Sequence, residues 1–184
     1  MAKPWDIPPL PQYGDVSEDE TYKGVGRIMS AWETIEFQLC IIHAVFCGDP
    51  RGEAMRLYGV QRVFPGRLDT LSKAAKEYII RHPNQANEGT FDKLLEEVRG
   101  YVDRRNEVAH GVVMDITRIT FFSRYLKNKS QTPPQHAAVA PYHAKHKHGS
   151  DGLPRYAYTA ANLAVLEKKM LALFVRLQDY EHAL

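Results

Sequence analysis

The chain lacks most of the features that assign a protein to a large functional class at first sight. Its 184 residues include only two cysteines, no apolar run of about 18 residues that could span a bilayer, and no secretory signal at the N-terminus. The net charge of +2 is too small for a surface that coats nucleic acid broadly, although one local phosphate site is compatible with it. We therefore expect a soluble cytoplasmic protein without a membrane partner.

The two cysteines are too far apart to form a disulfide. Cys40 and Cys47 lie two turns apart on an expected helix, which separates their Cα atoms by roughly 10 Å. Both are expected to be buried thiols in a reducing compartment. Glu36 and His43 share the same helix edge, but the four side chains extend over about 16 Å and cannot bind one ion together. Ordinary packing is therefore favoured over a metal site, with at most a neighbouring pair of ligands.

Motifs for nucleotide cofactors and for acyl transfer are also missing. The sequence has no P-loop, no Gly-x-Gly-x-x-Gly and no Gly-x-Ser-x-Gly. No cofactor is therefore expected. The length suits one domain that buries its own core without a metal or disulfide.

Hydrophobic periodicity predicts an all-α fold, a four-to-five-helix antiparallel bundle. Apolar residues recur at steps of three and four residues, the pattern of a helix with one buried face. Such segments predict long helices over about residues 20–46, 65–82, 90–110 and 159–184, and a shorter helix over 53–58. Pro65 suits a first helical turn, and Thr159 is placed to cap the last helix. Residues 84–89 are predicted to form a polar loop.

Two segments fall outside this periodicity. Residues 1–16 carry four prolines and form an N-terminal arm, which either docks through Trp5 and its apolar neighbours onto the body or a partner subunit, or stays free. The helical domain covers residues 17–184. An insert of about residues 112–158 separates the third and fourth long helices. It comprises a strand over 112–122, an irregular segment over 127–154 and a short returning strand over 155–158, as in a β-hairpin or loop.

The third long helix ends in a group of residues suited to phosphate chemistry. Residues 104–111 read RRNEVAHG, so Arg105, Asn106 and His110 form an Arg-Asn-x-x-x-His string closed by Gly111. A guanidinium neutralises a phosphate, and an imidazole transfers protons near neutral pH. These are the two groups that a metal-free ribonuclease needs most. Arg104 is also close enough to reach a phosphate.

Helical geometry limits what one copy of this motif can do. Arg105 and His110 are five residues apart, about 140° around the axis of a straight helix. Either the helix ends near His110, as Gly111 favours, or a second copy of the helix completes the site. A structural role is the alternative, in which the Arg, Asn and His side chains bond the last free carbonyls of the helix.

A few further residues are supporting candidates. Glu36 lies beside the apolar seam of the first helix and either pairs with a cation such as Arg105 or is solvated or bonded locally. Lys145 and Lys147 lie among four histidines in the insert, which is a flexible polar loop, a phosphate-contacting segment or a transition-metal site. Tyr142 offers a ring on which an RNA base could stack.

The motif, its position and the bundle together resemble the HEPN superfamily, the nucleotide-binding domains of higher eukaryotes and prokaryotes. The signature of that family is an Arg, four to six residues and then a His, with a polar residue directly after the Arg. Here Arg105 matches the signature Arg, Asn106 the polar residue and His110 the signature His, and the tail from Pro141 to Thr159 is similar too. The resemblance covers roughly residues 20–184.

The resemblance implies a homodimer, in which two motif helices face each other across a shared cleft, and metal-independent cleavage of RNA. Many relatives are toxins or antiviral effectors in phage defence that are paired with a neutralising antitoxin, so a partner of this kind is expected. Other relatives only bind, and a catalytically inactive dimeric module for a nucleotide, an RNA or a protein is the second expectation. A third is an interaction protein built on the heptad seams, which an Arg105 buried in an internal salt bridge would favour.

Overall fold

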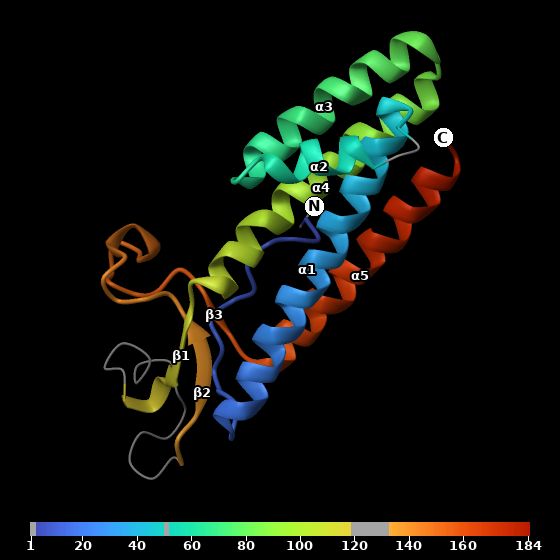
Figure 1. The fold of residues 1–184 in the computed structure, drawn as a ribbon. Helices are drawn as coiled ribbons and strands as arrows, with labels where there is room; N and C mark the ends of the chain where they lie inside the picture. Colours follow the sequence, from blue (N-terminus) through green and yellow to red (C-terminus); the bar gives the residue numbers. More distant parts are fainter. Residues whose placement is uncertain (1–2, 50–51, 119–132) are drawn as a thin grey trace. The chain divides into compact units, whose positions relative to one another are not determined.

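The computed structural model describes residues 3–49, 52–118 and 133–184. The helices of this part are α1 (Glu18–Cys47), α2 (Glu53–Val60), α3 (Phe64–Arg81), α4 (Gln85–Ala109) and α5 (Ala160–His182) (Figure 1). Between α4 and α5 lie three strands, β1 (Val112–Asp115), β2 (His136–Val139) and β3 (Ala157–Tyr158), and two short 3₁₀ helices, η1 (Ile116–Arg118) and η3 (Lys145–Lys147). The prediction of a helical bundle with a β insert between the third and fourth long helices is confirmed.

Two predicted helix starts are found where local chemistry places them. Pro65 lies in the first turn of α3, where its missing N–H has no helical partner to lose. Thr159 precedes α5, and its hydroxyl accepts the N–H of Asn162 at 3.3 Å. Short-range sequence signals are therefore sufficient to predict the starts of α3 and α5.

The start of α4 differs from the prediction. The helix begins at Gln85, so the polar loop predicted over residues 84–89 is wrong. Asn84 supplies the reason, because its Oδ1 accepts the backbone N–H groups of Ala86 and Asn87, both at 3.2 Å. An asparagine in this position satisfies the free donors of a first turn, and this cap extends the helix without an apolar stripe.

The insert contains a small antiparallel sheet with the strand order β1-β2-β3. Val139 of β2 faces Val112 of β1 on one side and Ala157 of β3 on the other. β2 lies where the sequence predicts no regular structure, because its alanines are weak strand formers and pairing on both sides stabilises it instead. β1 ends at Asp115, and residues 119–122 of the predicted strand lie outside the described residues.

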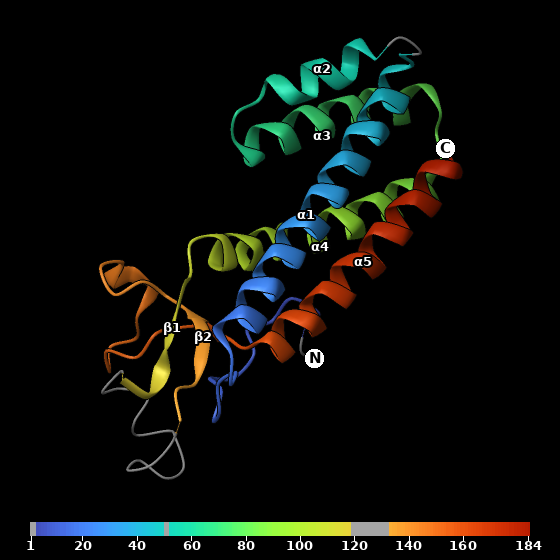
Figure 2. The same cartoon turned by 60° about the horizontal axis from the view of Figure 1, so that its bottom comes forward.

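The chain forms two compact units, residues 1–32 with 99–170 and residues 33–98 with 171–184. In the first unit, the initial turns of α1 and α5 lie side by side in both ribbon views (Figure 2). They approach closely at Gly24, where a Cβ would lie 2.8 Å from Leu163 Cδ1. Leu163 is fully buried and has no space to retreat, so glycine is needed at this point of the helix.

Two glycines of α1 provide a matched test of this contact. We expect Gly24→Ala to destabilise the protein by about 1–2 kcal/mol, because overpacking against Leu163 outweighs the gain in helix propensity. A Cβ on Gly26 would meet no described atom within 4 Å, so Gly26→Ala should stabilise by about 0.5–1 kcal/mol. Chemical unfolding of both variants measures the difference. Equal and stabilising effects would contradict the close approach of α1 and α5.

The N-terminal arm docks onto the body of its own chain. The Trp5 ring lies against Gly100 of α4 and leaves no room there for a Cβ. It also packs edge-on against Tyr101, with ring centroids 6.1 Å apart. Lys169 of α5 donates to the Pro4 carbonyl at 2.8 Å. Tryptophan and one ammonium thus hold the first part of the arm.

Asp15 fastens the end of the arm. Its backbone forms two hydrogen bonds with His136 of β2, each 2.8 Å long. Its carboxylate Oδ2 accepts the Thr21 hydroxyl of α1 at 2.6 Å and the Ala160 N–H of α5 at 2.7 Å. One side chain therefore joins the start of α1 to the start of α5, and its backbone adds the sheet.

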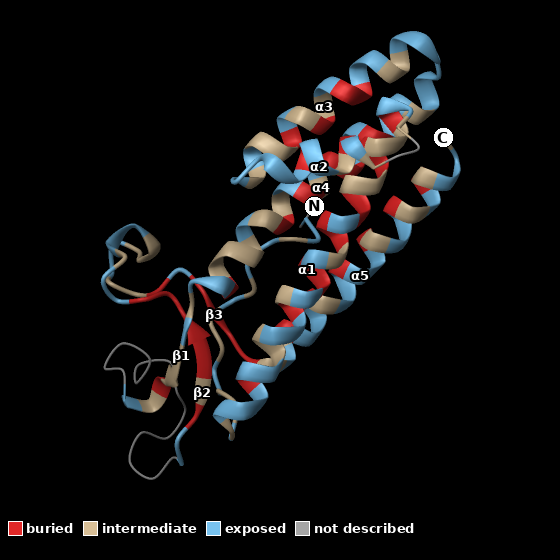
Figure 3. Ribbon diagram, viewed as in Figure 1, coloured by how far each residue is buried: buried red, intermediate tan, exposed pale blue. Residues whose placement is uncertain are grey.

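Aromatic rings form the core of the second unit. Phe46 of α1 lies 5.1 Å from the Tyr78 ring of α3 and 5.2 Å from the Phe91 ring of α4. Tyr180 of α5 stacks on Phe91 at 5.5 Å. Figure 3 shows the buried positions recurring along α1 and α4, as the heptad spacing in the sequence predicts.

Candidate functional site

The last turn of α4 carries the motif found in the sequence. α4 ends at Ala109, yet the His110 N–H still donates to the Asn106 carbonyl at 3.1 Å. The Gly111 N–H then closes the turn on Val108 at 3.2 Å. The backbone is thus helical up to His110, and the separation of about 140° between Arg105 and His110 around the axis persists in a single chain.

Arg105 and Asn106 contact each other directly. Arg105 Nη1 donates to Asn106 Oδ1 at 3.1 Å, and both side chains are half-buried. Arg105 Nε is buried without a hydrogen-bond partner, and Arg105 makes no ion pair with any described residue. His110 is exposed. The Arg105 guanidinium is therefore held by a neutral amide. A buried salt bridge of Arg105, which would favour an interaction protein without catalysis, is not found in the described part of the chain.

Arg104 belongs to a different network, which the sequence reading did not identify. Arg104 Nη2 lies 3.0 Å from Glu107 Oε1, and the Tyr158 hydroxyl of β3 donates to Glu107 Oε2 at 2.5 Å. Burial raises the pKa of the Glu107 carboxyl above its ordinary value, while the Tyr158 hydrogen bond and the Arg104 charge limit that rise. The spacing of Arg104 and Glu107 is typical of a helical ion pair, whereas Tyr158 has no sequence signal of this contact.

The insert leaves the sheet beside the motif. Val139 faces Val112, so the chain that follows β2 runs next to Gly111. Lys147 of η3 lies 5.9 Å above the Tyr156 ring and is close enough to lower the pKa of Glu107. Of the insert residues selected from the sequence, Lys147 is thus the one that the structure joins to the motif network.

The remaining insert candidates are exposed. The Tyr142 ring is 78% exposed and packs edge-on against His148 at 6.2 Å. Lys145 is exposed on η3, and the His148 ring bonds the Ala144 carbonyl at 3.1 Å. The Tyr142 ring and the Lys145 ammonium are therefore both accessible to solvent.

Glu36 pairs with a different cation from the one suggested by the sequence. It is 8% exposed and forms an ion pair with Arg67 of α3 within the second unit. Its charge adds to burial in raising the pKa of Tyr58 above the ordinary tyrosine value. The expected pairing with a cation is found, but the cation is Arg67 of α3 and not Arg105, and the alternative of a solvated carboxylate is wrong.

Two classes of site are absent from the described part of the chain. Residues 3–49, 52–118 and 133–184 contain no group of three or more His, Cys, Asp or Glu side chains placed to hold a metal ion. Their helices include none with the length and apolar character needed to cross a bilayer.

The two cysteines differ in exposure. Cys40 is half-buried, and burial raises the pKa of its thiol. Cys47 is exposed at the end of α1, so the expectation of two buried thiols is wrong for Cys47.

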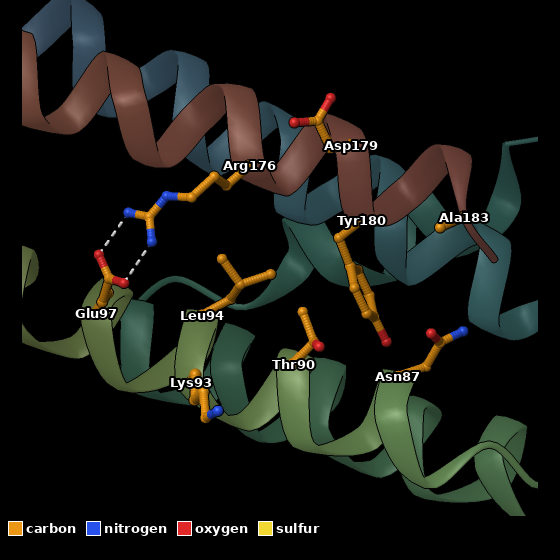
Figure 4. Close-up of a pocket in the computed structure, with 9 residues that line it drawn as sticks. All are labelled: Asn87, Thr90, Lys93, Leu94, Glu97, Arg176, Asp179, Tyr180 and Ala183. Carbon is orange, nitrogen blue, oxygen red and sulfur yellow. Dashed lines mark hydrogen bonds and ion pairs between the residues drawn. The ribbon is translucent and has the colours of Figure 1, made fainter.

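One cavity of about 470 Å³ lies in the second unit between α4 and α5. Figure 4 shows Arg176 reaching across to Glu97 with two parallel hydrogen bonds, both 2.6 Å long. Tyr180 reaches from α5 toward Thr90, and its hydroxyl is buried without a partner among the described residues. None of the candidate residues selected from the sequence lines this cavity.

No protein-family model, curated protein or solved structure matches the chain in the comparisons with known proteins.

Proposed function

We propose that the protein is a metal-independent endoribonuclease whose active site is formed by the motif at the end of α4. The RNA 2′-OH attacks the adjacent phosphorus, the bond to the 5′-oxygen breaks, and a 2′,3′-cyclic phosphate remains. His110 of one or both subunits takes the proton of the 2′-OH and delivers a proton to the leaving 5′-oxygen. Arg105 stabilises the charge on the nonbridging oxygens, and Asn106 orients Arg105.

The Arg105–Asn106 pair and the exposed His110, all at the end of one helix, carry this proposal. The Arg105 guanidinium donates to the Asn106 amide, and it forms no ion pair with any residue in the described part of the chain. A cation without a carboxylate is available to a phosphate. The exposed imidazole of His110, five residues after Arg105 and four after Asn106, is available to a proton-transfer step. An arginine without an ion pair and an exposed histidine are the two features of the octapeptide that support RNA cleavage.

The angle between Arg105 and His110 supports a homodimer as the active form. One chain directs the two groups about 140° apart, so a second motif helix must supply the group that the first cannot bring. Light scattering of the purified protein should give about twice the mass of one chain. A monomer that cleaves RNA at full rate would contradict the composite site.

RNA is the proposed substrate and DNA is not, because the attacking 2′-OH is missing from DNA. Arg104, Lys145, Lys147 and Tyr142 are proposed to contact the RNA backbone and bases. A nuclease of this kind in the cytoplasm damages its own cell, which fits a toxin or antiviral effector that is held by an antitoxin or a regulatory partner. Incubation of matched RNA and DNA strands with EDTA present tests the substrate, and cleavage of the DNA strand would exclude this mechanism.

A catalytically inactive dimeric module that binds a nucleotide, RNA or a protein is the second candidate. One observation favours it: Glu107 neutralises Arg104, which reduces the positive charge at a site in a chain whose net charge is only +2. Cleavage of a total-RNA pool separates the two functions. Binding of labelled RNA without any cleavage would support the module.

A further inference from the structure

Glu107 connects two parts of the first unit that are far apart in the sequence. Its Oε1 faces Arg104 of the same helix at 3.0 Å, and its Oε2 accepts the hydroxyl of Tyr158 at 2.5 Å. Tyr158 is 1% exposed, and the side chains of Arg104 and Glu107 are 12% and 16% exposed. Both carboxylate oxygens are therefore used, one by the motif helix and one by β3.

His110 lies on the same part of the helix surface. At 100° per residue it falls between Asn106 and Glu107, about 40° from the first and 60° from the second. Within the described part of the chain, the hydrogen bonds of the turn that carries it are backbone bonds, from His110 to Asn106 and from Gly111 to Val108. Glu107, three residues before His110, adds a side-chain link from this end of the helix to the sheet.

We propose that Glu107 is a positioning residue of the RNA-cleaving site, whose ionised carboxylate holds Arg104 and Tyr158 together and so fixes the turn that carries His110. The inference rests on the proposed function. Glu107 does not act as a catalytic residue, because both of its oxygens are occupied within the chain. Its effect reaches the RNA through Arg104 and through the position of His110.

The charge of Glu107 is set by its surroundings. Asp103 and Arg104 of α4, Tyr158 of β3, Tyr156 just before β3 and Lys147 of η3 are the titratable and charged groups that act on it. Burial outweighs the other contributions and raises the pKa of the carboxyl. The link is therefore complete above this raised pKa and is lost as the pH falls through it.

The pH dependence of cleavage tests the role. In the parent protein, protonation of Glu107 should break the link, so kcat should show an additional decrease of about tenfold as the pH falls through the raised pKa of Glu107. In Glu107→Gln this additional decrease should be absent, because the amide does not titrate. At neutral pH this variant should show about a tenfold lower kcat with KM within about twofold of the parent, since an amide cannot replace the charge.

Tyr158→Phe removes one bond of the same link and keeps the ring. We expect a kcat reduced several-fold, and this variant keeps the test decisive if Glu107→Gln fails to fold. Asp103→Asn removes an exposed carboxylate beside Glu107, and Tyr156→Phe removes a buried hydroxyl without a described partner. Both controls should retain the parent kcat and the additional acid-side decrease.

The two proposals fail in different ways. Suppose that RNA is cleaved by the parent and not by His110→Ala. Parent kcat in both Glu107→Gln and Tyr158→Phe, with the additional acid-side decrease retained in Glu107→Gln, would then overturn the role of Glu107 alone. A parent protein that cleaves no RNA would overturn the ribonuclease and this inference together. Thermal unfolding of each variant distinguishes a lower cleavage rate in a folded protein from a loss of folding.

Discussion

His110→Ala should lower the rate of RNA cleavage by about 10²–10⁴-fold when EDTA is present, because the imidazole carries the proton transfers of the proposed reaction. The variant should remain folded, since His110 is exposed at the end of α4 and its backbone bond to Asn106 does not depend on the side chain. The measurement is the initial rate on a labelled single-stranded RNA with a mapped 2′,3′-cyclic phosphate end. Unchanged cleavage would remove His110 from the mechanism.

Matched controls separate a catalytic role from a general loss of charge. His146→Ala removes an exposed histidine of η3 and should retain the parent rate. Arg105→Ala should lower the rate by about 10²-fold, whereas Arg99→Ala removes an exposed arginine six residues earlier on the same helix and should have a small effect. Similar losses in Arg99→Ala and Arg105→Ala would indicate weakened electrostatic attraction of RNA instead of a specific site.

Mixing the two inactive variants tests the shared site. Random exchange of subunits between Arg105→Ala and His110→Ala places one intact Arg105 and one intact His110 in about half of the dimers. If one of each group is sufficient, the mixture should regain cleavage that neither variant shows alone. A mixture as inactive as its components, after exchange is demonstrated by labelled subunits, would contradict a cleft shared in this way.

Asp15→Ala should destabilise the protein by about 2–4 kcal/mol, which corresponds to a fall of roughly 5–15 °C in Tm. The carboxylate accepts two short hydrogen bonds, from the Thr21 hydroxyl and the Ala160 N–H. Thr21 is completely buried, so its hydroxyl would be left without its acceptor, and α5 would lose the acceptor for its first N–H. Chemical and thermal unfolding measure the loss.

Two further variants define what Asp15 contributes. Asp15→Asn keeps the shape and one acceptor oxygen, and it should recover at least half of the stability lost in Asp15→Ala. Asp6→Ala removes an exposed arm carboxylate that bonds only the nearby Lys3 N–H in the described chain, and it should change stability by less than about 0.5 kcal/mol. If Asp15→Ala were as mild as Asp6→Ala, the arm would not be a structural part of the first unit.

Local patterns were sufficient for the helices. The seams of α1 and α5, the proline in the first turn of α3 and the threonine before α5 each act within one or two turns of chain, so periodicity and capping rules predict them. The start of α4 was not predicted, because the first turn that Asn84 caps has no apolar stripe to mark it as helical. The motif at residues 104–111 was visible for the same reason, since all of its members lie in one octapeptide.

The sequence by itself determined the helices, the presence of an insert and the identity of the motif residues, because these depend on neighbours within a few positions. Only the tertiary structure decided the partners of the buried charges. Arg67 rather than Arg105 pairs with Glu36, Tyr158 reaches Glu107 across 51 residues, and Asp15 reaches Ala160 across 145. A buried carboxylate must find a donor, but which donor lies within reach is set by the packing of distant segments and not by local spacing.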